Sequence, residues 1–401
     1  MTQIQIQQRP FLTRPEQFQG VPPFMAEILA RRGVQSEQEL ELKLKHIMPP
    51  HLKGLDAAVE LIDQAIDRQQ QIVIIGDYDA DGATSTALMI LVLKEMGAKV
   101  EYLVPDRFKY GYGLTPKIAE LAKQSYQPDV LITVDNGISS HAGVETAQAL
   151  GMQVIITDHH LTTKPTPNAE AVVNPNQLGC DFPSKALAGV GVAFYVLAKL
   201  ASYRTQQGKS STKVTQYLDL VALGTYADVA SLDYNNRILI DTGLKRIQQY
   251  QCRAGILALL DIAKRDAATL RAQDLGFVVG PRINAAGRME SMRIGIECLL
   301  AADMAEAYPI AQQYIYTSSS PKSCSVACCC AVSGTAAARS AGAPLPRAGG
   351  QPHRQQGDGG HVGSGRLERP RCHRGAAAPA GDGTGGGAGR PAAGVFRPPL
   401  S

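Results

Sequence analysis

The sequence IVIIGDYDADG, residues 72–82, joins an apolar β-branched run to a loop that contains three aspartates. The run IVII at 72–75 is short and continuously apolar, which is typical of a strand that is buried on both faces of a sheet. Before it, LDAAVELIDQAID at 55–67 repeats apolar residues at helical spacing, and after it ATSTALMILVLKEM at 83–96 is also helical in character. The sequence therefore predicts a helix, a buried strand, an acidic loop and a second helix in succession.

The same alternation continues to residue 174. Helical segments such as SHAGVETAQAL separate further β-branched runs, which are VEYLV at 100–104, VLITV at 130–134, VIIT at 154–157 and AVVN at 171–174. Buried strands that alternate with helices form βαβ units, whose sheet is parallel and covered on both faces. We therefore predict an α/β fold with a doubly wound, mainly parallel sheet.

The remainder of the chain divides into segments of different character. Residues 1–50 are polar and rich in glutamine, and we interpret them as an accessory segment before an α/β catalytic domain at 51–180. Residues 181–315 are mainly helical and are interpreted as the rest of the catalytic core. Within them, GPRINAAGRM at 280–289 is predicted to be a glycine-rich break before another helix.

Residues 316–401 form a fourth segment with a biased composition. The last 68 residues contain 17 of the 39 glycines and neither isoleucine nor lysine. Such a sequence cannot bury enough apolar surface to offset its chain entropy, so we predict a disordered tail. Two origins fit this composition: a GC-rich sequence read out of frame, which we favour, and a natural low-complexity tail.

Charge is unevenly distributed along the chain. The formal net charge is +4, but residues 323–401 carry nine arginines and three acids, which leaves −2 for residues 1–322. This excludes nucleic-acid binding through a global positive field and requires local clusters or bound cations instead. The N-terminus lacks a secretory signal, and no apolar run approaches the ~18 residues of a membrane span, so we predict a cytoplasmic protein.

Acidic and imidazole side chains follow three of the predicted strands. IVII is followed by Asp77, Asp79 and Asp81, VLITV by Asp135, and VIIT by Asp158, His159 and His160. The loops at the carboxyl ends of parallel strands open onto one crevice. We therefore expect these side chains to form a single site although they are far apart in the sequence.

The three aspartates of the first loop indicate a divalent metal, because carboxylates this close repel one another unless cations lie among them. The segment also matches the opening of a calcium-binding EF-hand loop. However, the twelfth position is Leu88 instead of a bidentate glutamate, and a strand precedes the loop instead of a helix. A solvated acidic turn is the structural alternative. The helix predicted from Ala83 would also direct free N–H groups into the loop and favour a phosphate oxygen.

His159 and His160 are adjacent at a strand end. Successive strand residues point in opposite directions, so one imidazole is expected to bind metal while the other faces substrate or a supporting partner. Carboxylate and imidazole ligands suit Mn²⁺ or Mg²⁺ better than structural zinc. Two such ions ~3.5–4 Å apart would activate a water and stabilise the leaving oxygen of a displacement at phosphorus.

The sequence DRFKYGYGL at 106–114 interleaves basic and aromatic residues between glycines. Aromatic rings beside cations stack on unpaired bases, so Arg107, Tyr110 and Tyr112 are candidate contacts for single-stranded nucleic acid. Packing of Phe108 and Tyr110 into the core is the alternative.

Five motifs occur in the order GDYDADG, VDNG, TDHH, GTYADVASL and GPRINAAGRM. Together they resemble the successive motifs of the RecJ branch of the DHH phosphoesterases over about residues 50–300. The resemblance implies a single-strand-specific 5′→3′ DNA exonuclease that acts in DNA repair and recombination. It would release 5′-mononucleotides by two-metal catalysis with Mn²⁺ or Mg²⁺.

The resemblance also implies a role for individual residues. The metal ligands would be Asp79, Asp81, Asp135, His159 and Asp228, with Asp135 bridging. Asp77 and Asp158 would be inner or supporting members of the site, and His160 would contact the scissile phosphate. Without the family, Asp228 would be interpreted as a helix-end capping residue.

By the same resemblance, Arg282, Asn284 and Arg288 would grip the nucleic-acid backbone. Forked guanidinium groups and closely approaching glycines suit phosphate oxygens, which supports this interpretation. A plain surface turn is the alternative.

The sequence after residue 315 does not resemble the rest of the family, which continues into a DHH-associated domain and an oligonucleotide-binding barrel. We therefore expect this chain to bind DNA weakly and to be impaired as an enzyme. Two other functions stay open: a DHH phosphodiesterase for short oligonucleotides or cyclic dinucleotides, and a non-catalytic DNA-binding fragment. The expected partners are single-stranded DNA, a single-strand-binding protein and a helicase, without membrane contact, and the chain is expected to be a monomer.

Overall fold

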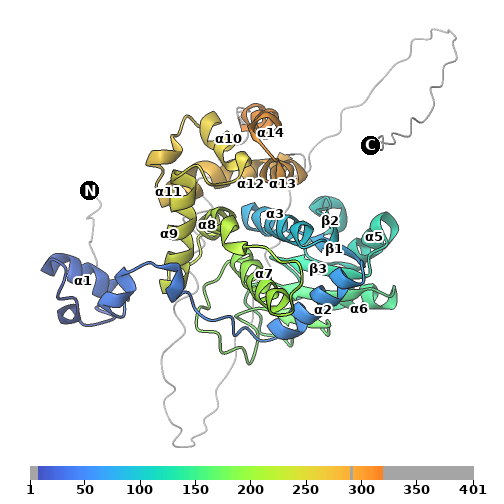
Figure 1. The fold of residues 1–401 in the computed structure, drawn as a ribbon, viewed down its shortest axis with the longest axis horizontal. Helices are drawn as coiled ribbons and strands as arrows, with labels where there is room; N and C mark the ends of the chain where they lie inside the picture. Colours follow the sequence, from blue (N-terminus) through green and yellow to red (C-terminus); the bar gives the residue numbers. More distant parts are fainter. Residues whose placement is uncertain (1–7, 290–291, 319–401) are drawn as a thin grey trace, which may run out of the picture. The chain divides into compact units, whose positions relative to one another are not determined.

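A computed structural model describes residues 8–289 and 292–318 of the chain, with a parallel sheet at its centre. The strands lie in the order β2-β1-β3-β4-β5 (Figure 1). Their bounds are Gln71–Ile75 for β1, Lys99–Leu103 for β2, Val130–Val134 for β3, Gln153–Thr157 for β4 and Ala171–Val173 for β5. All four pairings are parallel, which confirms the predicted fold class. Since β2 lies on one side of β1 and β3 on the other, the direction of winding reverses between β1 and β3.

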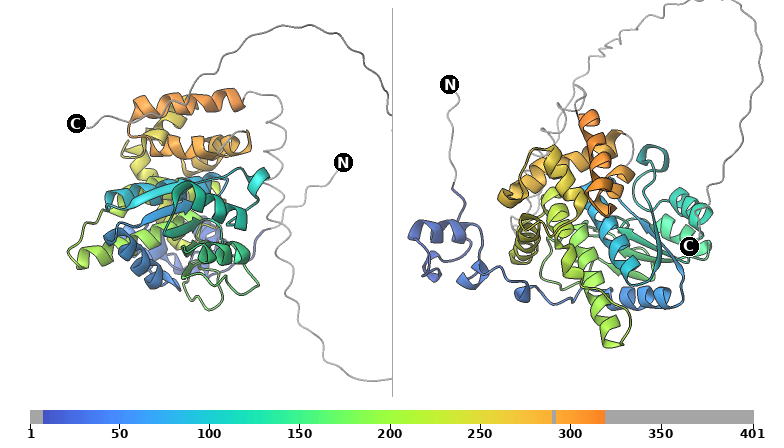
Figure 2. Two further views of the ribbon diagram at one scale, coloured as in Figure 1. Left: turned by 90° about the vertical axis from the view of Figure 1, so that its right-hand side faces the viewer. Right: turned by 45° about the horizontal axis from the view of Figure 1, so that its top comes forward.

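Both faces of the sheet are covered, as the uninterrupted apolar strands predicted. Along β1, Ile72 and Ile74 belong to one hydrophobic cluster, whereas Val73 and Ile75 belong to another on the opposite face. Figure 2 shows helices packed on both sides of the sheet. The first cluster includes α2 (Leu55–Asp67), α3 (Ala80–Glu95) and α7 (Gly189–Gln206), and the second includes α5 (Pro116–Tyr126) and α6 (His141–Ala149).

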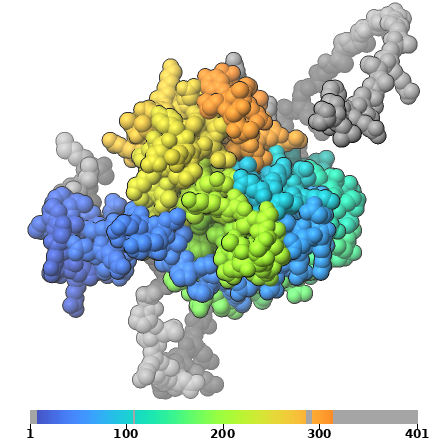
Figure 3. Space-filling model, in the orientation of Figure 1, coloured from blue at the N-terminus to red at the C-terminus, as the bar shows by residue number. Residues whose placement is uncertain are grey.

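Helix α3 is buried around most of its circumference, because helices of the second half of the chain cover the side that faces away from the sheet. It packs against α7 and α8 (Leu218–Ala227), and α8 in turn packs against α9 (Tyr234–Gln248). In Figure 3 the green segment that contains α7 and α8 lies between the blue and the yellow parts of the chain. The remaining longer helices are α10 (Ala254–Ile262), α12 (Gly280–Met289), α13 (Met292–Leu300) and α14 (Met304–Ser318).

Helix α3 begins at Ala80, three residues before the predicted start at Ala83. Asp79 is the N-cap residue, and its Oδ1 accepts a hydrogen bond of 2.9 Å from the N–H of Gly82, as short polar side chains at this position do. The N–H of Ala83 donates to the carbonyl of Asp79. The prediction of free N–H groups from Ala83 onward was therefore wrong, and Asp81 lies inside the first turn.

The segment GPRINAAGRM at 280–289 is helical throughout as α12, so the predicted break was wrong. The helix continues from a π-helical turn at Leu275–Val279, next to Pro281, which has no N–H to donate. Gly276 and Gly280 pack closely against α8, because a Cβ at these positions would lie 2.7 Å from the Tyr226 ring and 2.9 Å from the Ala227 Cβ. These glycines therefore permit a close helix contact instead of breaking the helix.

The N-terminal segment has a small hydrophobic cluster of its own. Helix α1 (Pro23–Arg31) contributes Ala26 and Ala30, which pack with Phe18 and Val34. Short helical turns lie at Pro15–Gln17, Glu37–Leu40 and Leu44–His46, and elsewhere at Arg107–Tyr110 (α4), Val214–Tyr217, Ala267–Thr269 and Ala272–Asp274 (α11). Glu39 forms a 2.7 Å ion pair with Arg237 of α9.

The three predicted boundaries between the four segments stay predictions. One hydrophobic cluster contains Ile74 of the sheet and Leu223 of the helical part, so these two segments share a core. The predicted disordered tail at 316–401 begins too early, because α14 continues to Ser318, and residues 319–401 lie outside the described residues. Among the helices described, none is long and apolar enough to cross a membrane.

Candidate metal centre

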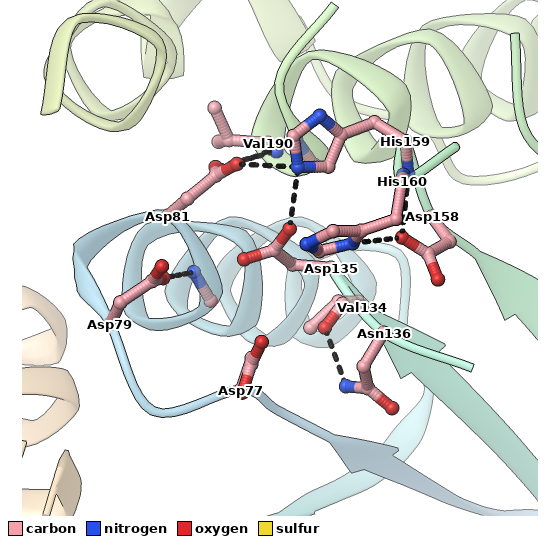
Figure 4. Close-up of polar contacts among 12 residues, drawn as sticks. Asp77, Asp79, Asp81, Val134, Asp135, Asn136, Asp158, His159, His160 and Val190 are labelled. Atoms are coloured by element: carbon pink, nitrogen blue, oxygen red, sulfur yellow. Dashed lines mark hydrogen bonds and ion pairs between the residues drawn. The ribbon is translucent and has the colours of Figure 1, made fainter. Parts of the chain in front are cut away.

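The predicted site residues meet at the carboxyl ends of β1, β3 and β4, beside the point where the winding of the sheet reverses (Figure 4). Open α/β sheets bind their ligands at this position. His159 Nε2 lies 3.0 Å from Asp135 Oδ1 and 3.8 Å from Asp81 Oδ2. The side chains that follow three different strands therefore form one cluster, as the sequence predicted.

Two groups of side chains have ligand atoms close enough to share a metal ion. Asp135, His159 and His160 form one group, and Asp81, His159 and Asp228 form the other, with all ligand atoms of a group within 4.8 Å of one another. Asp228 is the C-cap residue of α8, and the close contact between α8 and α3 brings it to the site. His159 belongs to both groups, so the two candidate ion positions are adjacent.

Asp135 has an unusual backbone and an unusual environment. It is buried, and its φ of 61° is left-handed, which only a small share of non-glycine residues adopt. A Cβ at Gly189 would lie 2.6 Å from the Asp135 Cβ, so only glycine fits there. Asp135 Oδ1 has no hydrogen-bond partner in the part of the chain that the structure describes. A buried carboxylate oxygen that accepts no hydrogen bond and lies 3.0 Å from an imidazole nitrogen is in a position that suits a shared metal ion.

Helix α7 holds the Asp81 carboxylate by its N-terminal N–H groups. Asp81 Oδ2 accepts a hydrogen bond of 2.6 Å from Gly189 N, and Oδ1 accepts one of 2.9 Å from Val190 N. The partial positive charge at a helix N-terminus favours this arrangement. On the opposite side, a Cβ at Gly224 of α8 would lie 3.1 Å from Asp81 Oδ1, so α8 approaches the carboxylate closely as well.

Asp77 and Asp79 lie on the side of the loop that leads into α3. Asp79 is held as the helix cap, and Asp77 Oδ1 accepts a 2.7 Å hydrogen bond from the N–H of Tyr78. Asp77 Oδ2 accepts a 2.6 Å hydrogen bond from the hydroxyl of Tyr112. Tyr112 is 61% exposed, so this residue reaches from the surface into the acidic loop.

The carboxylates raise one another's pKa values. Burial, followed by repulsion from Asp228, raises the pKa of Asp81 well above its usual range, and burial with repulsion from Asp81 does the same for Asp135. Burial raises the pKa of Asp228 to about 7 and that of Asp77 to about 6. So many buried acids are unfavourable together unless cations compensate them. The donor set of carboxylate oxygens and one shared imidazole therefore fits divalent metal ions.

The two histidine rings lie beside each other, with centroids 4.6 Å apart, instead of pointing in opposite directions as predicted. The prediction was wrong because β4 ends at Thr157, so the alternation of a strand no longer applies at these residues. Burial lowers the pKa of His159, which favours the neutral imidazole that metals bind. The hydrogen bond to Asp158 raises the pKa of His160 to about 9.

Asp158 orients both histidines. Its Oδ1 lies 2.7 Å from His160 Nδ1 and accepts a hydrogen bond of 2.7 Å from the N–H of His159, while Oδ2 accepts one of 2.8 Å from the N–H of Ile138. Burial acts to raise the pKa of Asp158, but the hydrogen bonds and charge of His160 and the hydrogen bond from Ile138 together outweigh it, and the pKa is lowered. Both oxygens of Asp158 are therefore occupied by these contacts, and the residue positions the two histidines.

Three asparagines support the centre and were not predicted from the sequence. Asn174 Nδ2 donates to the carbonyl of His160 at 3.0 Å, and Asn176 Nδ2 donates to the carbonyl of His159 at 2.6 Å. Asn136 Nδ2 donates to the carbonyl oxygens at the ends of β1 and β3 at 3.1 and 2.8 Å. The Asn-Pro-Asn sequence at 174–176, directly after a predicted strand, was the signal available for two of them.

The predicted nucleic-acid contacts of the 106–114 segment differ in position. Tyr112 lies at the acidic loop, whereas Tyr110 packs partly against the hydrophobic cluster of α5 and α6, as the alternative interpretation expected. Arg107 begins α4, and its side chain lies outside the described part of the chain.

The predicted contacts of α12 also differ. Asn284 Oδ1 accepts a 2.6 Å hydrogen bond from the N–H of Ala80, so it joins α12 to the first turn of α3. Arg282 Nη1 donates to the carbonyl of Val278 at 2.6 Å within its own helix. Arg288 lies in α12 with its side chain outside the described atoms. Their contacts with nucleic acid stay predictions.

Residues 71–225 match the model of the DHH family, N-terminal domain. The single-stranded-DNA-specific exonuclease RecJ of Escherichia coli K12 is 47% identical over 319 residues, which cover 78% of this chain and 55% of that protein. The protein of the same name from Bacillus subtilis 168 is 36% identical over 298 residues, 73% of this chain and 36% of its own length. The chain thus spans about half the length, or less, of these curated relatives.

Solved structures share the fold. An exonuclease RecJ bound to manganese superposes with a TM-score of 0.60 at 34% identity and covers 67% of this chain and 66% of that one. RecJ of Thermus thermophilus in complex with Mn²⁺ superposes with a TM-score of 0.64 at 30% identity, covering 76% of this chain and 43% of that one.

Proposed function

The chain belongs to the RecJ branch of the DHH family, and on this basis we propose that it hydrolyses phosphodiester bonds in single-stranded DNA. It would act from the 5′ end and release 5′-mononucleotides, in DNA repair and recombination. The observation that carries the proposal is the meeting of Asp81, Asp135, His159 and Asp228, which come from four separate segments, in two adjacent groups of potential ligands.

We propose Asp79, Asp81, Asp135, His159 and Asp228 as the ligands of two Mn²⁺ or Mg²⁺ ions, with Asp135 between the two. Asp135 fits the bridging position, because it interacts electrostatically with Asp81 and Asp79 on one side and lies against His159 on the other. When bound, the ions would activate a water and neutralise charge that develops on the phosphate.

His160 is proposed to contact the scissile phosphate. Its Nδ1 is held by Asp158, which leaves Nε2 to donate to a phosphate oxygen, and its side chain is 45% exposed. Asp158 orients this imidazole, and Asp77 holds the Tyr112 hydroxyl beside the acidic loop. These residues therefore bind and position the substrate while the carboxylates hold the metal.

Recognition of the single strand is proposed for Arg107, Tyr110, Tyr112, Arg282, Asn284 and Arg288. The exposed ring of Tyr112 supports this for one residue, because an aromatic face beside the acidic loop can stack on an unpaired base. We further propose a cytoplasmic monomer that works with a single-strand-binding protein and a helicase.

The proposal is tested by Mn²⁺-dependent digestion of a 5′-labelled single strand, with Asp135→Asn as the comparison and a blunt duplex of the same sequence as a second substrate. We expect labelled mononucleotide from the single strand with the wild type alone. Equal rates for wild type and variant would remove this site from consideration. Faster cleavage of dinucleotides or cyclic dinucleotides would favour the related phosphodiesterase activity, and metal-independent DNA binding without turnover would favour a non-catalytic role.

A further inference from the structure

The segment at 184–190 contacts three of the proposed metal ligands. The backbone of Leu187 forms a hydrogen bond with the His159 ring, and the N–H groups of Gly189 and Val190 hold Asp81. At Gly189 the absence of a side chain allows Asp135 to lie against the backbone. The position of this segment therefore affects the positions of Asp81, Asp135 and His159, which follow three different strands.

Asn236 connects this segment to the loop that follows Asp228. It lies in the first turn of α9, its side chain is fully buried, and its Nδ2 donates to the carbonyl of Ala186 at 2.7 Å and to the carbonyl of Ser231 at 2.9 Å. Both partners are carbonyl oxygens, which only accept hydrogen bonds, so the orientation of the amide is fixed. One amide group thus joins the segment that contacts Asp81, Asp135 and His159 to the loop that follows Asp228.

We propose that Asn236 is a positioning residue that fixes the distance between Asp228 and the ligands held by the 184–190 segment. The inference rests on the proposed function in that it assumes that these side chains bind divalent metal. Asp228 and Asp81 share His159 in one group of potential ligands, so a shift of either segment would open that group. Outer partners of metal ligands typically change metal affinity or activity by about 10–100-fold when they are replaced.

A second link runs parallel to the first. The hydroxyl of Ser184 donates to Asp233 Oδ2 at 2.6 Å, and Asp233 Oδ1 caps α9 by accepting from the N–H of Asn236 at 2.8 Å. Asn236 and Ser184 therefore hold the same segment to the start of α9. Loss of the Ser184 hydroxyl leaves the Asn236 amide in place, so its effect on metal binding is expected to be smaller.

The neighbouring Asn235 provides a matched control. It is also fully buried, but its Oδ1 accepts hydrogen bonds from Met48 N at 3.1 Å and from the Tyr195 hydroxyl at 2.9 Å, so it is engaged away from the metal centre. In Asn235→Asp a carboxylate oxygen still accepts both hydrogen bonds. In Asn236→Asp the two donors are lost and a carboxylate faces two carbonyl oxygens. Both changes bury a new carboxylate, so the general cost to folding is present in each.

The experiment measures Mn²⁺ binding to the full chain by calorimetry and by the electron paramagnetic resonance signal of free Mn²⁺, together with hydrolysis of the labelled single strand. We expect Asn236→Asp to weaken Mn²⁺ binding by about 10-fold or more and Asn235→Asp to change it by less than about threefold. Asn236→Ala, which removes both donors and buries no new charge, is also expected to weaken Mn²⁺ binding by about 10-fold and provides the measurement if Asn236→Asp does not fold.

The failures of the two proposals are distinguishable. Equal Mn²⁺ affinities for the two aspartate variants, or a wild-type affinity in Asn236→Ala where Asn236→Asp does not fold, would overturn the role of Asn236 while wild-type hydrolysis upheld the nuclease. Wild-type Mn²⁺ binding without hydrolysis would overturn the nuclease, and a selective loss of affinity in Asn236→Asp would still support the positioning role. A wild-type chain that binds no Mn²⁺ would overturn both.

Discussion

Asp135 shows most clearly how the site is built at the scale of one residue. Its backbone is left-handed, its side chain is buried, and Gly189 leaves room for it. Each of the first two features is unfavourable for an aspartate. Residues held in such conformations cost free energy that the rest of the fold must supply, and they cluster at functional sites. The conformation of Asp135 is therefore a property of the centre and not of its local sequence.

Asp135→Asn should increase stability in the absence of metal and abolish metal-dependent hydrolysis. The amide removes one of several mutually repelling buried acids, and asparagine tolerates the left-handed conformation. We expect a gain of about 1 kcal/mol in the free energy of unfolding with chelator present. Urea unfolding with EDTA and with Mn²⁺ measures this, and a variant that is less stable than the wild type in EDTA would contradict the explanation.

Val229, next to Asp228, is a β-branched residue with a φ of 58° and is 70% exposed. Asparagine adopts this conformation at lower cost, and little burial is lost, so Val229→Asn should stabilise the fold by about 1 kcal/mol. Thermal unfolding should show a rise of about 2–4 °C. The control is Leu178→Asn, at an exposed apolar residue that has an ordinary backbone conformation, and an equal rise in both variants would argue against strain at Val229.

The sequence was sufficient to predict that the acidic and imidazole side chains directly after strands lie together, because strand ends in a parallel sheet share one edge. Asp228 carries no such signal, since it ends a helix and reaches the site only through the packing of α8 on α3. Asn236 could not be predicted either, because it acts on backbone carbonyl oxygens that are far away in the sequence.

At the scale of elements, the strands were predictable and two helix boundaries were not. Continuous β-branched runs have few alternatives to buried strands, which explains the agreement for β1, β3 and β4. The acidic sequence suggests a loop at Asp79, whereas the Asp79 side chain also caps α3 and lets the helix begin at Ala80. The glycine-rich sequence at 280–289 suggests a break, whereas Gly280, together with Gly276 before it, allows α8 to pack closely.

Gly280→Ala tests this packing. The added methyl would lie 2.9 Å from the Cβ of Ala227, the last residue of α8, which directly precedes Asp228. Neither atom is at the end of a flexible side chain. We expect a loss of about 1–3 kcal/mol in the free energy of unfolding and weaker Mn²⁺ binding through displacement of Asp228. Phe277→Ala, in the same region but at a residue that is 77% exposed, should have a much smaller effect. A Gly280→Ala variant as stable as the wild type would show that α8 and α12 are not closely packed.

Asn284 can be examined in the same way. Asn284→Asp keeps an oxygen that accepts from Ala80 N, whereas Asn284→Ala removes it. If Asn284 mainly joins α12 to α3, the alanine variant should lose Mn²⁺ affinity and the aspartate variant should retain it. If it mainly contacts DNA phosphate, the aspartate variant should have the higher KM for single-stranded DNA, because it adds a negative charge.

At the scale of the whole molecule, a cluster of ion pairs joins α2 to the end of α7 and the residues after it. Arg204 of α7 contacts Asp63 and Asp67 of α2, and Lys209 contacts the same two acids. The Arg204 and Asp63 side chains are almost fully buried. Removing one partner of a buried pair is costly, because it leaves a buried charge without compensation.

Arg204→Met is therefore expected to lower the free energy of unfolding at neutral pH by about 3 kcal/mol and to leave Mn²⁺ affinity unchanged. The difference from the wild type should shrink in acid. Hydrogen bonds from Lys209 and from Arg204 lower the pKa of Asp67, so the contribution that Arg204 makes is present above the unfolded pKa of about 3.9 and is lost as the pH falls through the folded value. Urea unfolding at pH 7 and pH 3 measures both effects, and an equal difference at the two pH values would contradict the electrostatic explanation.

The composition of the whole chain predicted that charge alone would not bind DNA, and the site explains how binding could occur without a positive field. Around the centre the carboxylates outnumber the cationic side chains. A phosphate that binds there would therefore be attracted by the metal ions and not by cationic side chains. The account therefore depends on the presence of divalent cations between the ends of β1, β3, β4 and α8.

The most direct measurement is anomalous diffraction at the manganese absorption edge from crystals of the full chain grown with Mn²⁺. We predict two peaks that share His159 and Asp135 as neighbours, one of them bonded also to Asp81 or Asp228. An anomalous map without a peak among these residues, at a Mn²⁺ concentration that supports hydrolysis of single-stranded DNA, would contradict the account.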